Sequence, residues 1–189
     1  MKLYDSLPNS IIVNGRKVKL DLDFRNVIRM IDILARDELT HEAREYLALR
    51  CICRHPREGM IIPVYKLLFP DSKHADNEKL TDFEQDADLI RAAFLQEYGI
   101  NLFRDRLHWF EFTCLLSCLP SGSKYMEVLS IRARPMPTAQ KWNAEERAWL
   151  AKAKMEYAVK LTDKEIERNY QKSVQNIGKM LSALAGKDG

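Results

Sequence analysis

The hydrophobic residues of this chain recur mainly at the 3.6-residue spacing of amphipathic helices. The clearest stripe follows Asp23, a suitable N-cap, and comprises Phe24, Val27, Ile28, Ile31, Leu34 and Ala35. Further stripes predict helices over residues 40–54, 63–69, 82–98 and 107–119, and a short helix over residues 125–131. Gly99 is well placed to end the 82–98 helix, because glycine adopts a positive φ without strain. The pattern therefore indicates a mostly α chain.

The N-terminal region shows a different pattern. Residues 11–13 and 16–22 flank the dipeptide Asn14-Gly15, which tolerates two successive positive φ angles and so favours a two-residue type I′ turn. We expect the protein to open with a small β-hairpin.

The segment 107–119 is apolar on two faces. Leu107, Phe110, Cys114 and Cys118 form one stripe, and Trp109, Phe112, Leu116 and Leu119 form the other. A helix with so little polar circumference belongs at the centre of a fold.

A proline-containing break separates the C-terminal region. Pro135-Met136-Pro137 interrupts the helical pattern, and residues 135–142 are interpreted as a linker. Two helices are predicted beyond it, one starting at Asn143 with Glu146 three residues later and one at Thr162 with Glu165, both at capping-box spacing. The expected architecture is a multi-helix bundle in residues 1–134, which includes the hairpin, followed by a C-terminal helical hairpin in residues 143–189.

The last predicted helix carries a narrow apolar seam. Its residues recur at spacings of three and four, close to the 3.5-residue average of a coiled-coil contact: Ile166, Tyr170, Val174, Ile177, Leu181 and Leu184. The seam either packs against the rest of the chain or docks on a partner or on a second copy of the chain, and the sequence leaves both open.

Composition and charge exclude several classes of protein. Hydrophobic residues make up 46% of the chain and charged residues 30%, as in ordinary globular proteins. The net charge of +3 is close to balance, which disfavours nucleic-acid binding. Because residues 1–10 lack the apolar stretch of an export signal and no apolar run approaches the ~18 residues of a membrane span, we expect a soluble, unexported protein without membrane contact.

The four cysteines do not suggest a metal site. Cys51 and Cys53, and Cys114 and Cys118, fall within predicted helices, whereas structural zinc sites use cysteine knuckles on turns. We expect them to be reduced and to behave as small buried hydrophobes.

Catalytic patterns are also missing from the sequence. His108 has only Glu111 as a helical neighbour, and general acid–base chemistry needs a further partner, so His108 is interpreted as a satisfied core or boundary histidine. The sequence contains neither a phosphate-binding glycine loop nor a G-x-S-x-G elbow. We expect no enzymatic activity, no cofactor and no metal.

The segment 94–132 resembles a family of small helical proteins of phages and prophages of Gram-positive bacteria, commonly called gene product fifteen. The resemblance rests on Gln96-x-Tyr98-Gly99-Ile100-x-Leu102, on Leu107-His108-Trp109-x-x-Phe112 with Leu115-Leu116, and on Ile131-Arg132. The Asn14-Gly15 turn, Asp23-Phe24-Arg25 and the exit near Pro135 also agree, so the likeness covers most of residues 7–137. Asn101, where an aspartate is expected, and Cys118, where a small residue is common, depart from the pattern.

This resemblance implies a role in phage tail assembly. Such proteins are encoded among the tail genes of long-tailed phages, beside the tape-measure protein, and are regarded as assembly factors. A helical protein with an exposed apolar groove could keep an apolar tape-measure helix soluble until tail-tube subunits cover it. We therefore expect a tail-assembly chaperone that acts on the tape-measure or tube protein in the bacterial host cytoplasm. No catalytic residue carries over, and Tyr98, Gly99, His108, Trp109 and Phe112 are interpreted as determinants of the fold.

Two alternatives stay open. The first is a nucleic-acid-binding or regulatory phage protein that uses a basic surface, for which the candidates are Arg50, Arg54, Arg57, Arg104, Arg106, Arg132 and Arg134. Each group of arginines lies near a predicted helix end, where the helix dipole already favours cations. The second alternative is a minor structural component that remains in the tail.

Overall fold

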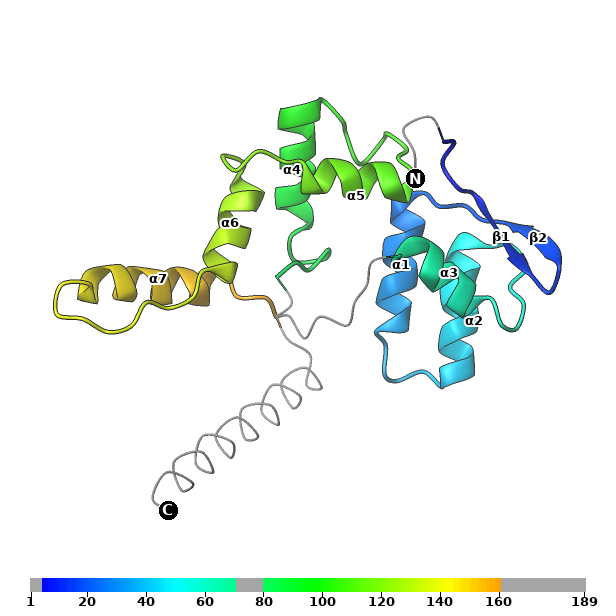
Figure 1. Ribbon diagram of the computed structural model, residues 1–189, viewed down its shortest axis with the longest axis horizontal. Helices are drawn as coiled ribbons and strands as arrows, with labels where there is room; N and C mark the ends of the chain where they lie inside the picture. Colours follow the sequence, from blue (N-terminus) through cyan, green and yellow to red (C-terminus); the bar gives the residue numbers. More distant parts are fainter. Residues whose placement is uncertain (1–4, 71–79, 161–189) are drawn as a thin grey trace, which may run out of the picture. The chain divides into compact units, whose positions relative to one another are not determined.

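The computed structural model describes residues 5–70 and 80–160, which contain seven α-helices and one two-stranded sheet (Figure 1). The elements are β1 (Ser10–Val13), β2 (Arg16–Lys19), α1 (Phe24–Leu34), α2 (His41–Ile52), α3 (Ile61–Leu68), α4 (Ala87–Tyr98), α5 (Trp109–Ser117), α6 (Lys124–Ala133) and α7 (Ala144–Glu156). The predicted mostly α fold with an N-terminal hairpin is confirmed. The chain divides into two compact units, residues 1–133 and 134–189, which are described separately.

The N-terminal hairpin forms around the predicted turn. β1 and β2 pair antiparallel from Ser10 opposite Lys19 to Val13 opposite Arg16. Asn14 and Gly15 have φ angles of 50° and 73°, as a type I′ turn requires. The second strand ends at Lys19, three residues earlier than predicted, because the following backbone pairs elsewhere: the Asp21 N–H donates to the Ile52 carbonyl at 2.8 Å.

α1 begins at the predicted cap Asp23, α2 begins after Thr40, where its start was predicted, and the two helices lie side by side in Figure 1. Oδ1 of Asp23 accepts a hydrogen bond from the Arg25 N–H at 3.1 Å, and Oγ1 of Thr40 accepts one from the Ala43 N–H at 3.3 Å. Each cap satisfies a backbone donor that has no partner within the helix.

α3 and α4 start at positions that differ from the prediction. α3 begins two residues before Pro63, which is tolerated because backbone donors in the first helical turn have no intrahelical partner. α4 begins at Ala87 rather than near Asp82, since the Asp82 carboxylate accepts hydrogen bonds from the N–H groups of Glu84 and Gln85 and so stabilises a turn. Gly99 ends α4 with a φ of 67°, as predicted.

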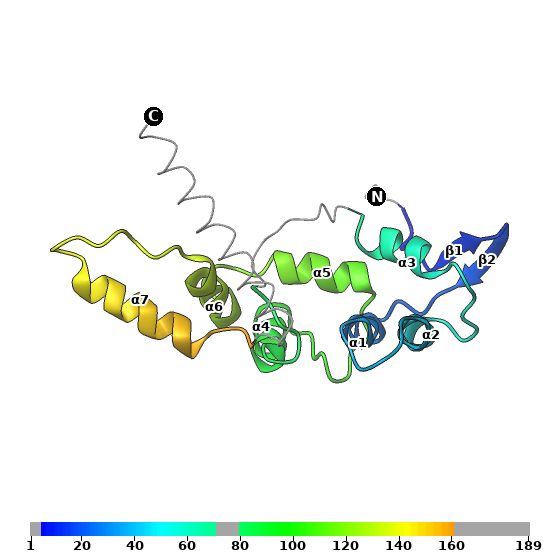
Figure 2. The same ribbon diagram turned by 90° about the horizontal axis from the view of Figure 1, so that it is seen from below.

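α5 lies against α1 and α4, which share one side of it (Figures 1 and 2). Only Trp109 and Phe112 of this helix are buried, whereas in the other stripe Leu107 and Phe110 are half-buried and Cys114 and Cys118 are exposed. The expectation that these two cysteines are buried is therefore wrong. The apolar circumference of α5 was read as burial on all sides, whereas the helix packs through one face.

A buried ion pair connects α4 to α6. The Arg132 guanidinium donates to both carboxylate oxygens of Asp86, at 2.7 and 2.8 Å, and also to the Leu80 carbonyl at 2.8 Å. Asp86 is 1% exposed and Arg132 is 7% exposed. Because both charges are paired and hydrogen-bonded, they are tolerated in the interior.

In the second unit, α7 begins after Asn143, but the predicted capping box is wrong. The Asn143 side chain accepts from the Gln140 N–H at 3.0 Å and donates to the Thr138 carbonyl at 3.0 Å, so it holds the preceding loop instead of the helix. Glu146 pairs with Arg134 at 2.6 Å. The second C-terminal helix, with Thr162 and Glu165, lies outside the described residues.

None of the described helices combines the length and the apolar character needed to span a membrane.

Candidate functional site

A surface groove of about 310 Å³ opens between α1 and α4. We refer to it as the α1–α4 groove. Residues from four separate segments line it: Phe24, Arg25, Ile28, Arg29, Phe83, Ala87, Ile90, Arg91, Leu102, Phe103 and Phe112. Its size is at the lower end of the range typical of ligand pockets.

The floor of the groove is aromatic. Phe112 of α5 stacks on Phe24 of α1 at 4.6 Å between ring centroids and on Phe94 of α4 at 5.3 Å. Phe83 approaches Phe112 at 6.1 Å. Since Phe112 is only 1% exposed, this cluster forms a packed base that fixes the spacing of α1 and α4.

One wall of the groove is a turn that follows α4. The Asp105 carboxylate accepts from the Asn101 N–H at 2.7 Å, and the Asn101 side chain accepts from the Phe103 N–H at 3.0 Å. This bonding fixes the backbone of residues 101–105. Phe103 stands in the turn with 70% of its surface exposed, and the Arg91 guanidinium lies over its ring at 4.5 Å from the centroid.

Positive charge surrounds the apolar floor. Arg25 and Arg29 come from α1 and Arg91 from α4, and the described lining contains no acidic side chain. Nε of Arg25 donates to Asp23 at 3.0 Å and one terminal nitrogen donates to the Asp105 carbonyl at 2.8 Å. The groove is thus apolar at its base and carries three guanidinium groups at its rim, of which Arg25 is paired with Asp23 and Arg91 with Asp88.

A second polar cluster joins the N-termini of α1 and α5. The Phe24 N–H donates to the Leu107 carbonyl at 3.0 Å and the Trp109 N–H to the Leu22 carbonyl at 2.7 Å. Arg106 pairs with Asp23 at 3.1 Å and with Asp21 at 3.2 Å. A pocket of about 240 Å³ lies beside these residues.

The charge state of Asp23 follows from these contacts. Burial raises the pKa of its carboxyl, but hydrogen bonds from the side chain and backbone of Arg25 and from the side chain of Arg106 lower it by more. The pKa of Asp23 therefore lies below its usual value, so the carboxylate is favoured in the folded protein. The same hydrogen bond from Arg106 to Asp23 raises the pKa of the Arg106 guanidinium.

Comparison with known proteins identifies the family. A family model described as bacteriophage Gp15 protein matches residues 3–159. The chain belongs to the bacteriophage Gp15 protein family. The match contains every element of the first unit and α7. The same comparisons find no matching curated protein and no matching solved structure.

The structure brings together the motif residues by which the chain resembles the Gp15 family. Trp109 and Phe112 are buried on one face of α5, where the Trp109 indole N–H donates to the Leu68 carbonyl at 3.4 Å. Tyr98 ends α4, and its hydroxyl donates to the Leu115 carbonyl at 2.8 Å. Gly99 turns the chain toward the Asn101 turn. The role of these motif residues as determinants of the Gp15 fold stays a prediction.

His108 has a defined function in the backbone of α5. It is the N-cap: Nδ1 accepts from the Phe110 N–H at 3.2 Å, while Nε2 lies 3.0 Å from the Pro8 carbonyl. Nδ1 must then be unprotonated and Nε2 must carry the hydrogen. Glu111 completes a capping box by accepting from the His108 N–H at 2.9 Å. Glu111 is thus more than the helical neighbour expected from the sequence, and its position three residues after the cap is the signal of a capping box.

Apart from Phe112, which belongs to the family motif, the sequence did not single out the groove residues. Phe24, Phe83 and Phe103 were assigned to helix stripes or left unassigned, because their proximity depends on contacts between distant segments. The seam from Ile166 to Leu184, a candidate partner surface, lies outside the described residues.

The cysteines are all free. Cys53 is buried, and burial raises the pKa of the half-buried Cys51 thiol, which lowers its thiolate fraction. Within residues 5–70 and 80–160, no three histidine, cysteine or acidic side chains are grouped as a metal site would need.

Four of the arginines considered for a basic surface already have partners within the protein. Arg132 is buried against Asp86, Arg106 pairs with Asp21 and Asp23, and Arg134 pairs with Glu146. Arg50 donates to the carbonyl of Arg54. Some of the candidate arginines thus have structural roles, and the others are exposed at scattered positions.

Proposed function

We propose that this chain is an interaction protein of phage tail morphogenesis, a chaperone or assembly factor that acts on the tape-measure or tail-tube protein. The observation that carries the proposal is the exposed, apolar α1–α4 groove in a member of a bacteriophage family. The proposal assigns no reaction to the chain and places its action in the host cytoplasm during assembly.

Physical reasoning connects the groove to this role. Grooves with an apolar base bind amphipathic helices of partner proteins, because burial of apolar surface supplies most of the binding free energy. A tape-measure protein presents long helical segments before the tube encloses it, and such segments need a soluble partner. The exposed Phe103 at the groove edge provides apolar area that a partner can cover.

Co-expression with tail proteins tests the proposal. The full chain is produced with the tape-measure protein, or with the tube protein, encoded in the same phage genome, and the soluble fraction and co-purifying protein are measured. We expect one of the two to become more soluble and to co-purify with the chain. If neither changes in solubility nor co-purifies, the proposed function is wrong.

Salt dependence separates this function from the nucleic-acid alternative. Protein–DNA affinity falls steeply with salt because phosphate contacts release counterions, whereas apolar burial responds little. We expect a complex with a tail protein that persists at high salt. The burial of Arg132 against Asp86 removes one of the arginines on which the alternative relied.

Purified particles distinguish an assembly factor from a structural component. A chaperone is released when the tube closes, so we expect the chain in lysates of assembling cells and not in purified virions. A stoichiometric band in the virion would instead establish the alternative of a minor tail component.

A further inference from the structure

We propose that the α1–α4 groove binds an amphipathic helix of a partner protein that inserts a large apolar side chain between α1 and α4 and places carboxylates against Arg25, Arg29 and Arg91. This inference rests on the proposed function and specifies the chemistry of the partner.

Apolar side chains are exposed at the groove edge and on α4. Phe103 is 70% exposed, and Leu95, one helical turn beyond Arg91 on α4, is 53% exposed. From Phe103 the groove leads to the packed floor at Phe112. A cavity of about 310 Å³ accommodates a large aliphatic or aromatic side chain, and a helix that carries it would also cover Phe103.

Charge complementarity selects an acidic partner. Three guanidinium groups and no carboxylate belong to the described lining. A carboxylate that approaches this rim meets planar donors suited to two parallel hydrogen bonds, whereas a lysine would meet repulsion. Leucines flanked by glutamates or aspartates on one helix match both parts of the groove.

The contacts of the arginines within the protein leave room for a partner. Arg91 pairs with Asp88 at 2.9 Å, but the Asp88 side chain is 96% exposed, so this ion pair is hydrated and contributes little. A partner carboxylate can replace it. Arg25 is held by the buried Asp23 and by the Asp105 carbonyl, so its guanidinium is fixed beside the groove before binding.

A protein partner fits better than a nucleic acid. The deep part of the groove is built from phenylalanine, isoleucine, leucine and alanine side chains, without the polar groups that read base edges. The rim offers three guanidinium groups, two of which are paired with Asp23 and Asp88, and the whole chain has a net charge of only +3. Burial of apolar surface therefore contributes more to the free energy of binding at this groove than contacts with phosphate would.

A designed peptide tests the inference on the full chain. The probe is a fluorescent helical peptide of about 15 residues with leucines at i, i+3, i+4 and i+7 and glutamates beside them. Its counterpart has lysine at each glutamate position. Fluorescence anisotropy should give an affinity for the acidic peptide at least about tenfold higher than for the lysine peptide, a difference of about 1.4 kcal/mol. Equal affinities would overturn the proposal.

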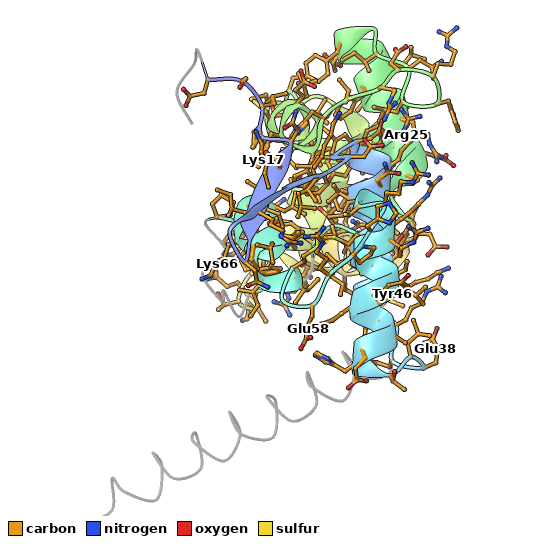
Figure 3. The ribbon with its side chains drawn as sticks, turned by 90° about the vertical axis from the view of Figure 1, so that its right-hand side faces the viewer. Lys17, Arg25, Glu38, Tyr46, Glu58 and Lys66 are labelled. Carbon is orange, nitrogen blue, oxygen red and sulfur yellow. The ribbon has the colours of Figure 1, made fainter. Side chains whose placement is uncertain are left out.

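Variants locate the binding surface. Phe103→Ala and Arg91→Glu should each weaken binding of the acidic peptide about tenfold, and Arg91→Glu should improve binding of the lysine peptide. The matched controls are Ile12→Ala, a 73% exposed apolar residue on β1, and Lys17→Glu on β2. In the view of Figure 3, Lys17 lies to the left and Arg25 to the right. If the control variants weaken binding as much as the groove variants do, the peptide binds elsewhere and the proposal is overturned.

Two further outcomes keep this inference separate from the proposed function. If the chain co-purifies with a tail protein and the groove variants do so equally well, the function stands and the groove proposal is wrong. If the acidic peptide binds at the groove while neither tail protein is captured, the groove proposal stands and the tail-assembly function is wrong.

Competition of a DNA oligonucleotide with the peptide, lost in Arg91→Glu, would identify the groove as a nucleic-acid site and overturn the proposal.

Discussion

Phe112 contacts both sides of the candidate site. Its ring packs between Phe24 and Phe94, so one side chain of α5 sets the separation of α1 and α4. Phe103 has the opposite character, because the same residue type stands at the surface with an arginine over its ring. Burial alone therefore separates a phenylalanine that maintains the groove from one that is available to a partner.

Replacement of Phe112 should test its place in the core. We expect Phe112→Ala to lower the free energy of unfolding by about 3–5 kcal/mol, because the substitution removes buried apolar surface and leaves a cavity. Phe103→Ala should change stability by less than about 0.5 kcal/mol, since its ring is mostly hydrated. Chemical denaturation of both variants measures the two values. An unchanged stability for Phe112→Ala would mean that the ring is at the surface.

Asp23 predicts a pH dependence of stability. Its folded pKa lies below the usual value of 3.8, so the charged carboxylate stabilises the folded state above that pH. This contribution should disappear as pH falls from about 3.8 through the lower pKa of the folded state. Asp23→Asn keeps a helix cap and removes the charge, so it should be less stable than the unmodified chain near neutral pH, and the difference should narrow in acid.

A second substitution identifies the cause of the Asp23 effect. In an Arg106→Gln background, Asp23→Asn should cost less at neutral pH, because one of the hydrogen bonds that lowers the pKa of Asp23 is already lost. Thermal melts of the four proteins over a pH series measure this coupling. A cost that does not depend on Arg106 would assign the effect to Arg25 and the helix terminus alone.

At the scale of elements, local signals were sufficient where a residue interacts with its own neighbours in sequence. Asn14-Gly15, Asp23 and Gly99 each perform the predicted turn or cap. Prediction failed where a side chain had a competing partner: Asn143 holds the loop before α7, and Asp82 stabilises a turn that delays α4. Spacing reveals that a side chain can form a cap, but not which of several nearby donors it accepts from.

The cap of α5 gives a prediction at this scale. His108→Ala should lower the free energy of unfolding by about 1 kcal/mol, because the Phe110 N–H loses its acceptor at the helix start. His108→Asn supplies a side-chain oxygen at the same position and should recover most of the loss. Denaturant unfolding compares the two variants. Equal losses would show that the contact with the Pro8 carbonyl, rather than the cap, is the important one.

On the scale of the whole molecule, the candidate site is assembled from segments that are far apart in sequence. α1, α4 with the turn before it, the 101–105 turn and α5 each contribute side chains to the groove. The helix stripes predicted which face of each helix is apolar, but the groove depends on which of these faces lie opposite one another. The family resemblance supplied the class of protein, and neither source indicated the arginine rim.

Removal of residues 161–189 tests whether the predicted seam, Ile166 to Leu184, docks on a partner. The hydrophobic core cluster of the first unit consists of residues between Ile11 and Tyr125, so we expect the truncated chain to melt cooperatively and to bind the acidic peptide. The docking hypothesis predicts that it loses self-association or tail-protein capture, as measured by light scattering and co-purification. A truncated chain that is insoluble or molten would show that the segment completes the protein's own core.

The buried pair of Asp86 and Arg132 has a consequence for the family's evolution. Loss of either partner alone leaves an uncompensated buried charge, at a cost of about 3–5 kcal/mol that approaches the whole stability of a small domain. Replacement of both by apolar residues of similar volume can be neutral or stabilising. Sequences descended from a common ancestor with this chain should therefore keep both residues or neither. An alignment of Gp15 proteins in which the two positions vary independently would contradict this expectation.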